Sequence, residues 1–367
     1  MKILVLMKRF SINKDLIMQN FGRQIRLFEH IKKFGHDVDF LCIDYTKFES
    51  KKVRINNIDY YIEPFSLIKF SVFLKKLNLL LSSMRYDIIV ASTSPILGII
   101  AYYYSKKYNI KMMYDLQDSF DVYDEYKIPM VKLIDKYVIK NADIVICVSE
   151  SLSKIVGQFR KKPTFIIQNG YETGLFKPLD KEKARKKLNL PIGAKIIVYI
   201  GSLERLKGFD VMLDALSLIR KKYPNAYLLI SGKIDKGIDV KQKNVIYRKF
   251  PKRQEVVLAI NSADVAIIPN LTNKFTKYSF PYKLVEYMAC RVPIVATKVG
   301  DVTNMLKNYK GSLCNPNDAD DLAEKIIDKL KHYERIDYGK ELMELDWEIL
   351  AVKLNKSIAK AYSAQKI

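Results

Sequence analysis

Short apolar runs alternate with longer stretches of helical periodicity along the chain. In the first half, the runs that predict strands are residues 3–6, 38–42, 87–91, 112–114, 143–148 and 165–167. Between them, residues 23–33 and 130–140 repeat apolar positions with the period of a helix. Near-continuous apolar strands separated by helices predict a parallel sheet covered by helices on both faces.

The same pattern begins again after a polar joint at residues 176–183. The second set of predicted strands is residues 195–200, 227–230, 244–247, 265–268 and 294–296. The chain is therefore predicted to be an α/β protein with two doubly wound domains. Ligands of such sheets bind beyond the carboxyl ends of the strands, so we expect the domains to face each other across a cleft that holds the active site.

Composition favours an ordinary folded protein without a membrane span. At 367 residues and 49% hydrophobic content, the chain is long enough for two cored domains. Its longest apolar stretch, residues 95–104, is about half of the ~20 residues that cross a bilayer, and the start is too short for a secretory signal. The four cysteines, Cys42, Cys147, Cys290 and Cys314, lack the close pairing of a zinc site or disulfide framework. We therefore expect buried thiols and a cytoplasmic protein.

A formal net charge of +23 is the most unusual bulk property. It predicts attraction to phosphate in nucleic acid, anionic lipid or phosphorylated substrates, unless most lysines simply lie on solvated helix faces. Residues 66–85 combine Leu, Ile and Phe with four cations. This segment is either a helix in an anionic membrane interface, which would place the protein peripherally on the inner face of the cytoplasmic membrane, or an ordinary helix packed on the first sheet.

Residues 198–208 join a predicted strand to a helix that should begin near Phe209. Gly201 would let a ligand approach the backbone, and Arg205 and Lys207 supply cations before the helix amino terminus. This arrangement suits a diphosphate, although a plain strand-to-helix turn with surface cations is also consistent with it. The spacing of glycine and lysine is not that of a Walker loop.

A second segment, residues 277–289, predicts a loop that enters a helix. Glu286 lies there among apolar neighbours, where a lone carboxylate needs a partner. Ribose hydroxyls could be that partner, because a carboxylate accepts two hydrogen bonds at once. Alternatively, Glu286 points to solvent or pairs with Lys283, one turn earlier.

Together, these two segments resemble the retaining family 4 glycosyltransferases of GT-B fold, and the resemblance runs through essentially the whole chain. The first half contributes Gly22 and Arg23, residues 34–38, the turn at 169–171 and the joint at 176–178. The second half contributes residues 262–269, 293–297, Gly300, Gly311 and 318–323. Trp347 precedes a final helix that, in such enzymes, returns to brace the first domain.

The resemblance implies domains at 1–175, on the acceptor side, and at 180–345, where a nucleotide sugar binds, with residues 346–367 forming the returning helix. Lys207 and Arg205 would neutralise the departing diphosphate, and Glu286 would hold the ribose. The remaining donor contacts would come from Gly22, Gly201, Ser202, Ser279 and Phe280. No bound metal or other cofactor is implied, and electrostatic stabilisation of the leaving group would be the main catalytic effect.

Three departures from the family pattern affect the site. Ser202 stands where the family often has arginine, and Tyr278 stands where the earlier of two glutamates would contact the donor hexose. A tyrosine hydroxyl could still bind a sugar. Gln117 replaces a histidine, and Asp115 with Asp118 is similar to an Asp-x-x-Asp pattern in a subgroup that modifies lipid-linked saccharides. We therefore assign a catalytic role toward the acceptor or donor hexose to Asp118, unless that carboxylate only caps the turn before the next helix.

The predicted function is transfer of a hexose or related sugar from a nucleoside diphosphate to a saccharide, lipid-linked or destined for a surface glycan. A nucleotide-sugar epimerase of the same architecture is the alternative enzyme, weakened by having only three histidines in the chain. A basic nucleic-acid-binding protein would also explain the charge, but no nucleic-acid motif is present. The absence of a His and Cys cluster in the sequence argues against catalytic zinc.

Overall fold

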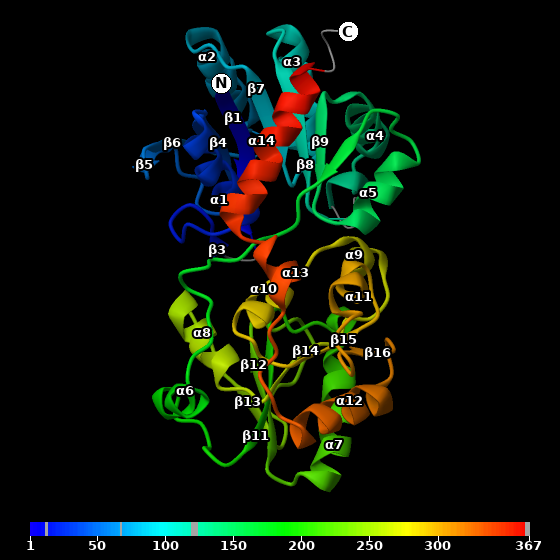
Figure 1. Ribbon diagram of the computed structural model, residues 1–367. Helices are drawn as coiled ribbons and strands as arrows, with labels where there is room; N and C mark the ends of the chain where they lie inside the picture. Colours follow the sequence, from blue (N-terminus) through cyan, green and yellow to red (C-terminus); the bar gives the residue numbers. More distant parts are fainter. Residues whose placement is uncertain (12–13, 67, 119–123, 364–367) are drawn as a thin grey trace. The chain divides into compact units, whose positions relative to one another are not determined.

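The computed structural model describes residues 1–11, 14–66, 68–118 and 124–363. The chain forms two compact units, Met1–Gln168 with Trp347–Ile367, and Asn169–Asp346. Helix α14 (Trp347–Ser363) thus belongs to the same unit as the start of the chain, and it packs on α1 (Arg23–His30) (Figure 1). None of the described helices combines the length and hydropathy needed to span a bilayer.

The first unit is built on a mainly parallel sheet with the strand order β10-β9-β8-β7-β1-β4-β6-β5. Only β5 runs antiparallel to its neighbour in this order. Its strands are β1 (Lys2–Lys8), β4 (Asp37–Asp44), β5 (Lys51–Ile55), β6 (Ile58–Pro64), β7 (Ile88–Ser92), β8 (Lys111–Leu116), β9 (Ile144–Cys147) and β10 (Thr164–Ile166), and a separate hairpin joins β2 (Phe10–Ser11) to β3 (Lys14–Asp15). The remaining helices are η1 (Ile31–Phe34), α2 (Phe70–Ser83), α3 (Pro95–Lys107), η3 (Asp124–Lys127), α4 (Val131–Asn141) and α5 (Glu150–Gly157).

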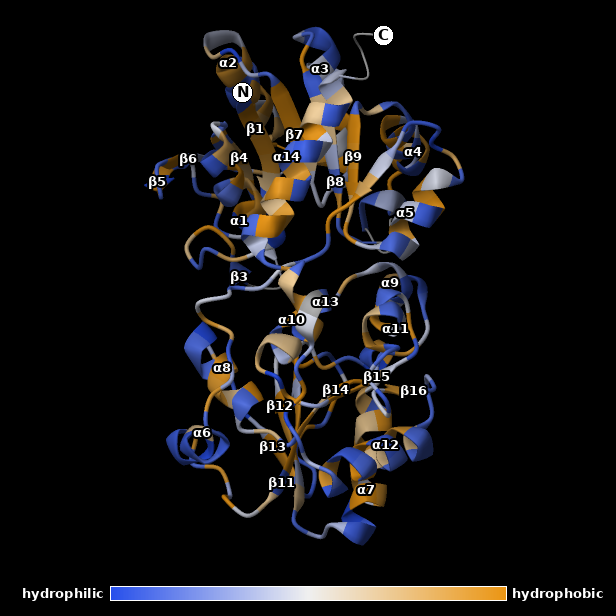
Figure 2. Cartoon of the chain, in the orientation of Figure 1, coloured by the Kyte–Doolittle hydropathy of each residue, from blue (hydrophilic) through white to orange (hydrophobic). Residues whose placement is uncertain are grey.

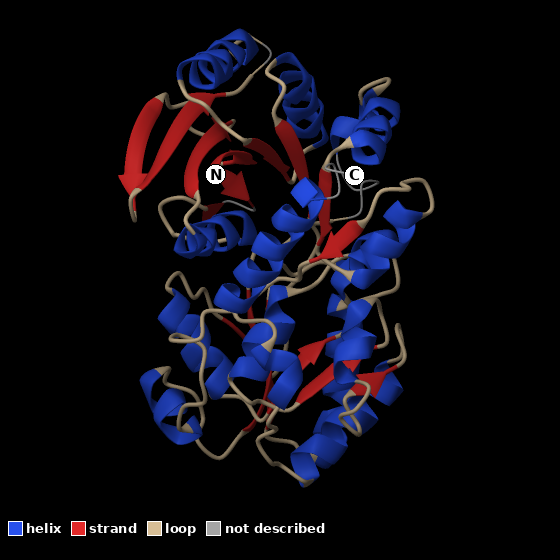
Figure 3. Ribbon diagram, turned by 45° about the horizontal axis from the view of Figure 1, so that its top comes forward, coloured by secondary structure: helices blue, strands red, loops and turns tan. Residues whose placement is uncertain are grey.

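Helices cover both faces of this sheet (Figure 3). The central strands are therefore apolar on both sides, as the colouring of β1, β7 and β9 shows (Figure 2), and every residue of β7 is buried. Burying such strands removes apolar surface from water, which is the main driving force of folding.

The second unit holds a fully parallel sheet with the order β13-β12-β11-β14-β15-β16. Its strands are β11 (Lys195–Ile200), β12 (Ala226–Ser231), β13 (Val245–Tyr247), β14 (Val265–Ile268), β15 (Ile294–Thr297) and β16 (Leu313–Cys314). Its helices are α6 (Lys181–Lys187), η4 (Arg205–Lys207), α7 (Phe209–Lys222), α8 (Arg253–Asn261), α9 (Lys274–Tyr278), α10 (Tyr282–Ala289), α11 (Asp301–Leu306), α12 (Ala319–Lys331) and α13 (Gly339–Met343). The strand order reverses between β11 and β14, and crevices that bind ligands form at such switch points.

The predicted α/β class and the two Rossmann-like sheets are confirmed, and each predicted apolar run lies on a strand. The helix expected near Phe209 begins at that residue. The segment expected at the membrane contains helix α2, Phe70–Ser83, which packs on β6 and buries Phe73, Leu77 and Leu80. All four cysteines are buried and free, and burial raises the pKa of Cys290 to about 12.

Candidate functional site

Two tyrosines hold the carboxyl end of β11, one from helix α10 and one that ties the strand to the loop after it. The Ile200 N–H donates to Tyr287 Oη at 2.8 Å, and the Tyr199 hydroxyl donates to the Ser202 carbonyl at 2.9 Å. Gly201 lies between these bonds with φ of 154°, a value that favours glycine. The loop after β11 and the start of α10 therefore lie against each other at the switch point between β11 and β14.

Lys207 is held inside this neighbourhood. Its side chain is only 14% exposed, and Nζ lies 3.0 Å from Glu204 Oε1 and donates a hydrogen bond to Ser202 Oγ. Burial raises the pKa of Glu204, but hydrogen bonds from Ser202 and Lys207 outweigh it and lower that pKa overall. The ammonium is thus positioned before any ligand arrives, and Ser202 is one of the residues that position it.

Arg205 behaves differently from Lys207, although both lie in η4. Its side chain is 73% exposed, and its Nε lies 3.5 Å from Oδ2 of the exposed Asp210. An exposed pair of this kind is worth at most about 1 kcal/mol. The proposed contact of Arg205 with a diphosphate stays a prediction.

Lys283 is a second cation beside Gly201. Its Nζ lies 3.7 Å from the centre of the Tyr199 ring, and a Cβ added to Gly201 would lie 2.7 Å from that Nζ. Burial lowers the pKa of Lys283 well below its ordinary value, and the charge of Lys207 lowers it further, while nearby carboxylates oppose both effects. Sequence reasoning considered Lys283 only as a partner of Glu286, because nothing local in the sequence places it over Tyr199.

Glu286 lies in α10 with its side chain 7% exposed. Its Oε1 is 2.8 Å from Arg253 Nη1, so the two alternatives that left it in solvent or paired it with Lys283 are wrong. Arg253 also donates to Glu172 Oε1 at 3.1 Å and stacks over the ring of Phe176 at 4.7 Å. Arg253 and Glu172 were missed, since they come from a helix and a loop far from Glu286 in sequence.

The segment before α10 supplies the remaining predicted donor contacts of this unit. Tyr278 ends α9 and is half-buried, and the Ser279 N–H donates to the Phe275 carbonyl at 3.1 Å. Phe280 is buried, and its carbonyl accepts from Asn169 Nδ2 at 2.6 Å. These two backbone groups are therefore already engaged within the protein, and their contact with a donor stays a prediction.

In the first unit, the predicted residues Gly22 and Asp118 lie beside different elements. Gly22 precedes α1 with φ of 106°, and Asp118 lies half-buried after β8. Gln117, which replaces the family histidine, donates to Asp115 Oδ2 at 2.7 Å. Asp115 also forms an ion pair with the buried Arg23, with 2.8 Å between Oδ1 and Nε. Gln117 is therefore hydrogen-bonded to a buried ion pair of the first unit.

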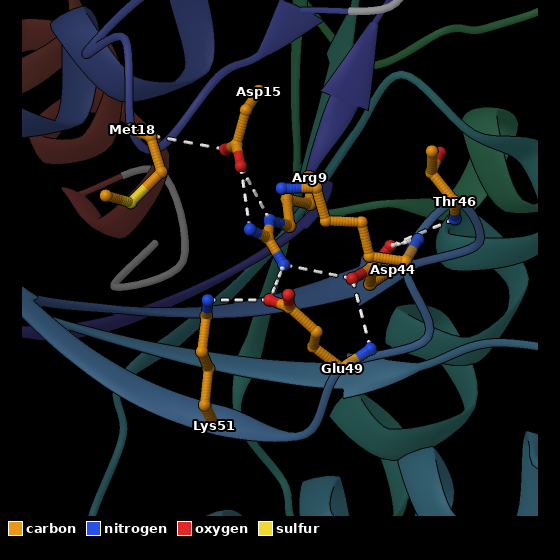
Figure 4. A network of polar contacts seen from close by, with 8 residues as sticks. Arg9, Asp15, Met18, Asp44, Thr46, Glu49 and Lys51 are labelled. Carbon is orange, nitrogen blue, oxygen red and sulfur yellow. Dashed lines mark hydrogen bonds and ion pairs between the residues drawn. The ribbon is translucent and has the colours of Figure 1, made fainter.

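A buried cation joins the loops after β1 and β4 (Figure 4). The Arg9 guanidinium contacts Asp15 at 2.7 Å, Asp44 at 3.0 Å and Glu49 at 2.6 Å. Lys51 also contacts Glu49, and hydrogen bonds from Lys51 and Arg9 lower the pKa of Glu49 to about 2. This network fixes the loops at the carboxyl edge of the first sheet, and no sequence motif indicated it.

Family comparisons match the two halves of the chain separately. Residues 25–175 match the family described as glycosyltransferase family 4, and residues 180–341 match glycosyl transferases group 1. An uncharacterized glycosyltransferase of Methanocaldococcus jannaschii is 24% identical over 316 residues, covering 83% of this chain and 84% of that protein. TuaC of Bacillus subtilis, described as a teichuronic acid biosynthesis glycosyltransferase, is 26% identical over 210 residues, covering 56% of this chain and 51% of TuaC. That match spans about half of the relative's length.

Solved structures share the fold over nearly the full chain. Sucrose-phosphate synthase from Thermosynechococcus elongatus superposes with a TM-score of 0.76 at 18% identity, covering 99% of each chain. Anabaena HepE in complex with UDP and glucose superposes with a TM-score of 0.74 at 18% identity, covering 99% of this chain and 100% of HepE.

Proposed function

Because the chain belongs to the family 4-like glycosyltransferases of GT-B fold, we propose that it transfers a sugar from a nucleoside-diphosphate sugar with retention of anomeric configuration. The observation that supports this most is that the switch point of the second sheet carries both a shielded ammonium, Lys207, and a buried carboxylate, Glu286. A nucleoside diphosphate presents the complementary groups, phosphate oxygens and ribose hydroxyls.

Negative charge develops on the diphosphate as the bond to the sugar breaks. In the proposed site, Lys207 stabilises that charge from a position already fixed by Ser202 and Glu204, so little reorganisation is needed. Glu286 accepts hydrogen bonds from the ribose, and Arg253 offsets the unfavourable burial of its carboxylate. The proposed reaction needs no metal ion, because side chains supply the positive charge.

Uridine diphosphate sugars are the first donors to test, since HepE is described in complexes with UDP and with UDP-glucose. For the acceptor we propose a saccharide that is lipid-linked or part of a surface glycan, in keeping with the description of TuaC. Such an enzyme would work in the cytoplasm, peripherally on the membrane that carries its acceptor. In the first unit, we propose that Gly22 approaches the donor and that Asp118 contacts the reacting sugars.

The epimerase alternative is not favoured, because the matched families and relatives are glycosyltransferases. A nucleic-acid-binding protein would be attracted by the same +23 charge, but it would bind polynucleotides with a strong dependence on salt. The two proposals therefore differ in the ligand that stabilises the fold.

A thermal-shift screen against nucleoside diphosphates, their sugar conjugates and polynucleotides tests the proposal. We expect a shift with one nucleotide series that is lost in Glu286→Ala, and loss of most transfer activity in folded Lys207→Ala. NMR of the product would then give its anomeric configuration. No shift with any nucleotide, together with a salt-sensitive shift with polynucleotide, would refute the donor site.

A further inference from the structure

We propose that Lys283 is the second cation of the diphosphate site and takes the place of the arginine that Ser202 replaces. This inference rests on the proposed donor site and adds a residue to it. Ser202 cannot supply the missing charge, because its hydroxyl is neutral, and that hydroxyl accepts a hydrogen bond from Lys207. Arg205, the other cation of the loop, has a side chain 73% exposed beside Asp210.

The position of Lys283 is set by helix α10 and strand β11 together. Because Tyr287 binds the Ile200 N–H, the first turn of α10 lies against the end of β11. Lys283 Nζ then lies over Tyr199 and against Gly201, where any side chain on residue 201 would displace it. The glycine that lets a diphosphate approach the backbone thus also leaves space for this ammonium.

Lys283 also lacks a neutralising partner. In the part of the chain that the structure describes, its Nζ makes no hydrogen bond or ion pair, and its contact is the face of the Tyr199 ring. A cation over an aromatic ring gains roughly 0.5–2 kcal/mol, less than a pairing with phosphate oxygens offers. A diphosphate would supply the missing anion.

The electrostatic surroundings predict how Lys283 responds to a ligand. Burial and the neighbouring Lys207 lower the pKa of Lys283, while Glu204 and Glu286 oppose this effect, and the buried Tyr199 and Tyr287 stay neutral because their pKa values are raised. Two phosphate anions would raise the pKa of Lys283 again. Binding of a diphosphate should therefore take up protons at any pH between the pKa of Lys283 in the free protein and its pKa in the complex.

The test compares affinities for the diphosphate and the monophosphate of one nucleoside, by calorimetry on the full chain. The probes are UDP and UMP, or the pair whose base the thermal-shift screen selects. Lys283→Met should weaken UDP binding about 10- to 100-fold and change UMP binding much less, because the lost charge-assisted contact belongs to the second phosphate. Lys283→Arg should restore part of the preference, and Lys221→Ala, at the far end of α7, should match the wild type.

Calorimetry in buffers of different ionisation enthalpy gives the second readout. Wild-type protein should take up protons on binding UDP, and Lys283→Met should take up fewer. A folded Lys283→Met protein with wild-type UDP affinity and unchanged proton uptake would overturn the role of Lys283. Failure of the wild type to bind any nucleoside diphosphate would instead refute the donor site itself.

A separate surface of the first unit carries a second inference. Helix α4 buries Asp135, Val138 and Ile139, yet its outer face presents an apolar stripe. The stripe consists of four large side chains that are 40% to 64% exposed: Met130, Leu133, Ile134 and Tyr137. Leu133, Ile134 and Tyr137 lie at the three- and four-residue spacing of one helix face, and Met130 is the residue just before the helix. Tyr103 of α3 is a further exposed aromatic residue.

Lysines accompany the stripe. Lys132, Lys136 and Lys140 are exposed at four-residue intervals along the same helix. Exposed apolar side chains beside a row of lysines suit an anionic bilayer, where apolar groups enter the acyl boundary and long cationic side chains reach the headgroups. We infer that α4, rather than the expected segment 66–85, docks the protein on anionic lipid.

Vesicle sedimentation tests the lipid inference independently of nucleotide binding. The full chain should bind phosphatidylglycerol vesicles and not phosphatidylcholine vesicles at low salt. Leu133→Ser with Tyr137→Ser should reduce binding about 10-fold or more, from the apolar area withheld, while the matched α2 variant Val72→Ser with Leu79→Ser, also at exposed apolar positions, should not. Absence of wild-type binding, or loss confined to the α2 variant, would overturn this inference.

Discussion

Arg253 Nη1 lies 2.8 Å from Glu286 Oε1, so the carboxylate proposed for ribose binding is held by a cation from another helix. A carboxylate that is 7% exposed would be costly to keep ionised without such a partner. The same contact also fixes its orientation, since Arg253 is itself held by Glu172. Arg253 is therefore expected to act as a positioning residue for the nucleotide site.

Replacement of Arg253 should separate stability from binding. Arg253→Met leaves Glu286 buried without its cation, which should destabilise the fold by about 2–4 kcal/mol and weaken nucleotide binding. Adding Glu286→Gln removes the buried charge and should recover much of the stability but none of the binding. Denaturant unfolding and calorimetry measure both quantities, and additive losses of stability in the double variant would contradict the coupling.

The two cations of η4 should contribute unequally to turnover. Lys207 is shielded and held by two partners, whereas Arg205 is exposed. Lys207→Ala should lower kcat/KM about 100-fold or more, by analogy with the loss of one group that stabilises developing charge. Arg205→Ala should cost less. Initial rates with the donor found by screening show which substitution lowers kcat/KM more. A larger loss in Arg205→Ala than in Lys207→Ala would show that Arg205 is the main cation of the site.

Asp135 should make stability depend on pH. Its carboxyl accepts from Tyr114 at 2.6 Å and Tyr126 at 2.7 Å, but burial outweighs these bonds and raises its pKa from 3.8 to about 6. The folded state therefore favours the protonated Asp135. Its contribution to the free energy of unfolding is fully present below pH 3.8 and is lost as pH rises through about 6. The loss amounts to about 3 kcal/mol.

Asp135→Asn removes that titration. The unfolding free energy of the variant, relative to the wild type, should rise between pH 4 and pH 7 (about 3 kcal/mol at most). Urea unfolding at several pH values provides the measurement. A difference between the two proteins that does not change with pH would show that Asp135 does not titrate in this range.

The Arg9 network predicts the opposite dependence. Arg9→Met would leave the carboxylates of Asp15, Asp44 and Glu49 facing one another, which should cost about 3–5 kcal/mol at pH 7. The folded pKa of Glu49 is lowered from 4.5 to about 2, so its contribution is present above pH 4.5 and is lost as pH falls through about 2. The difference in stability between the Arg9→Met variant and the wild type should therefore become smaller as the pH is lowered. Thermal unfolding from pH 7 to pH 3 measures this difference. A difference that did not change with pH would show that it does not arise from the ionised carboxylates.

Sequence alone predicted the features that depend on neighbours along the chain. Apolar runs of strand length located most strands of both sheets, although β5, β6 and β16 were not predicted, and the change of composition between residues 200 and 209 located the turn from β11 into α7. The motifs at Gly201 and Glu286 indicated the glycosyltransferase family for the same reason, because a few consecutive residues define each motif. Such patterns are determined by backbone periodicity and local turn chemistry.

Only the tertiary structure decided which charges meet. Arg253 and Glu286 are 33 positions apart, and Lys283 reaches Tyr199 because α10 packs against the end of β11. A long charged side chain on a helix can adopt several directions. Its partner depends on its burial and on the elements packed nearby, and no local sequence pattern determines these. The chain therefore reveals its fold and family by periodicity and motif, whereas the identity of the second cation and the partner of the buried carboxylate emerge only when the sheet brings distant loops together.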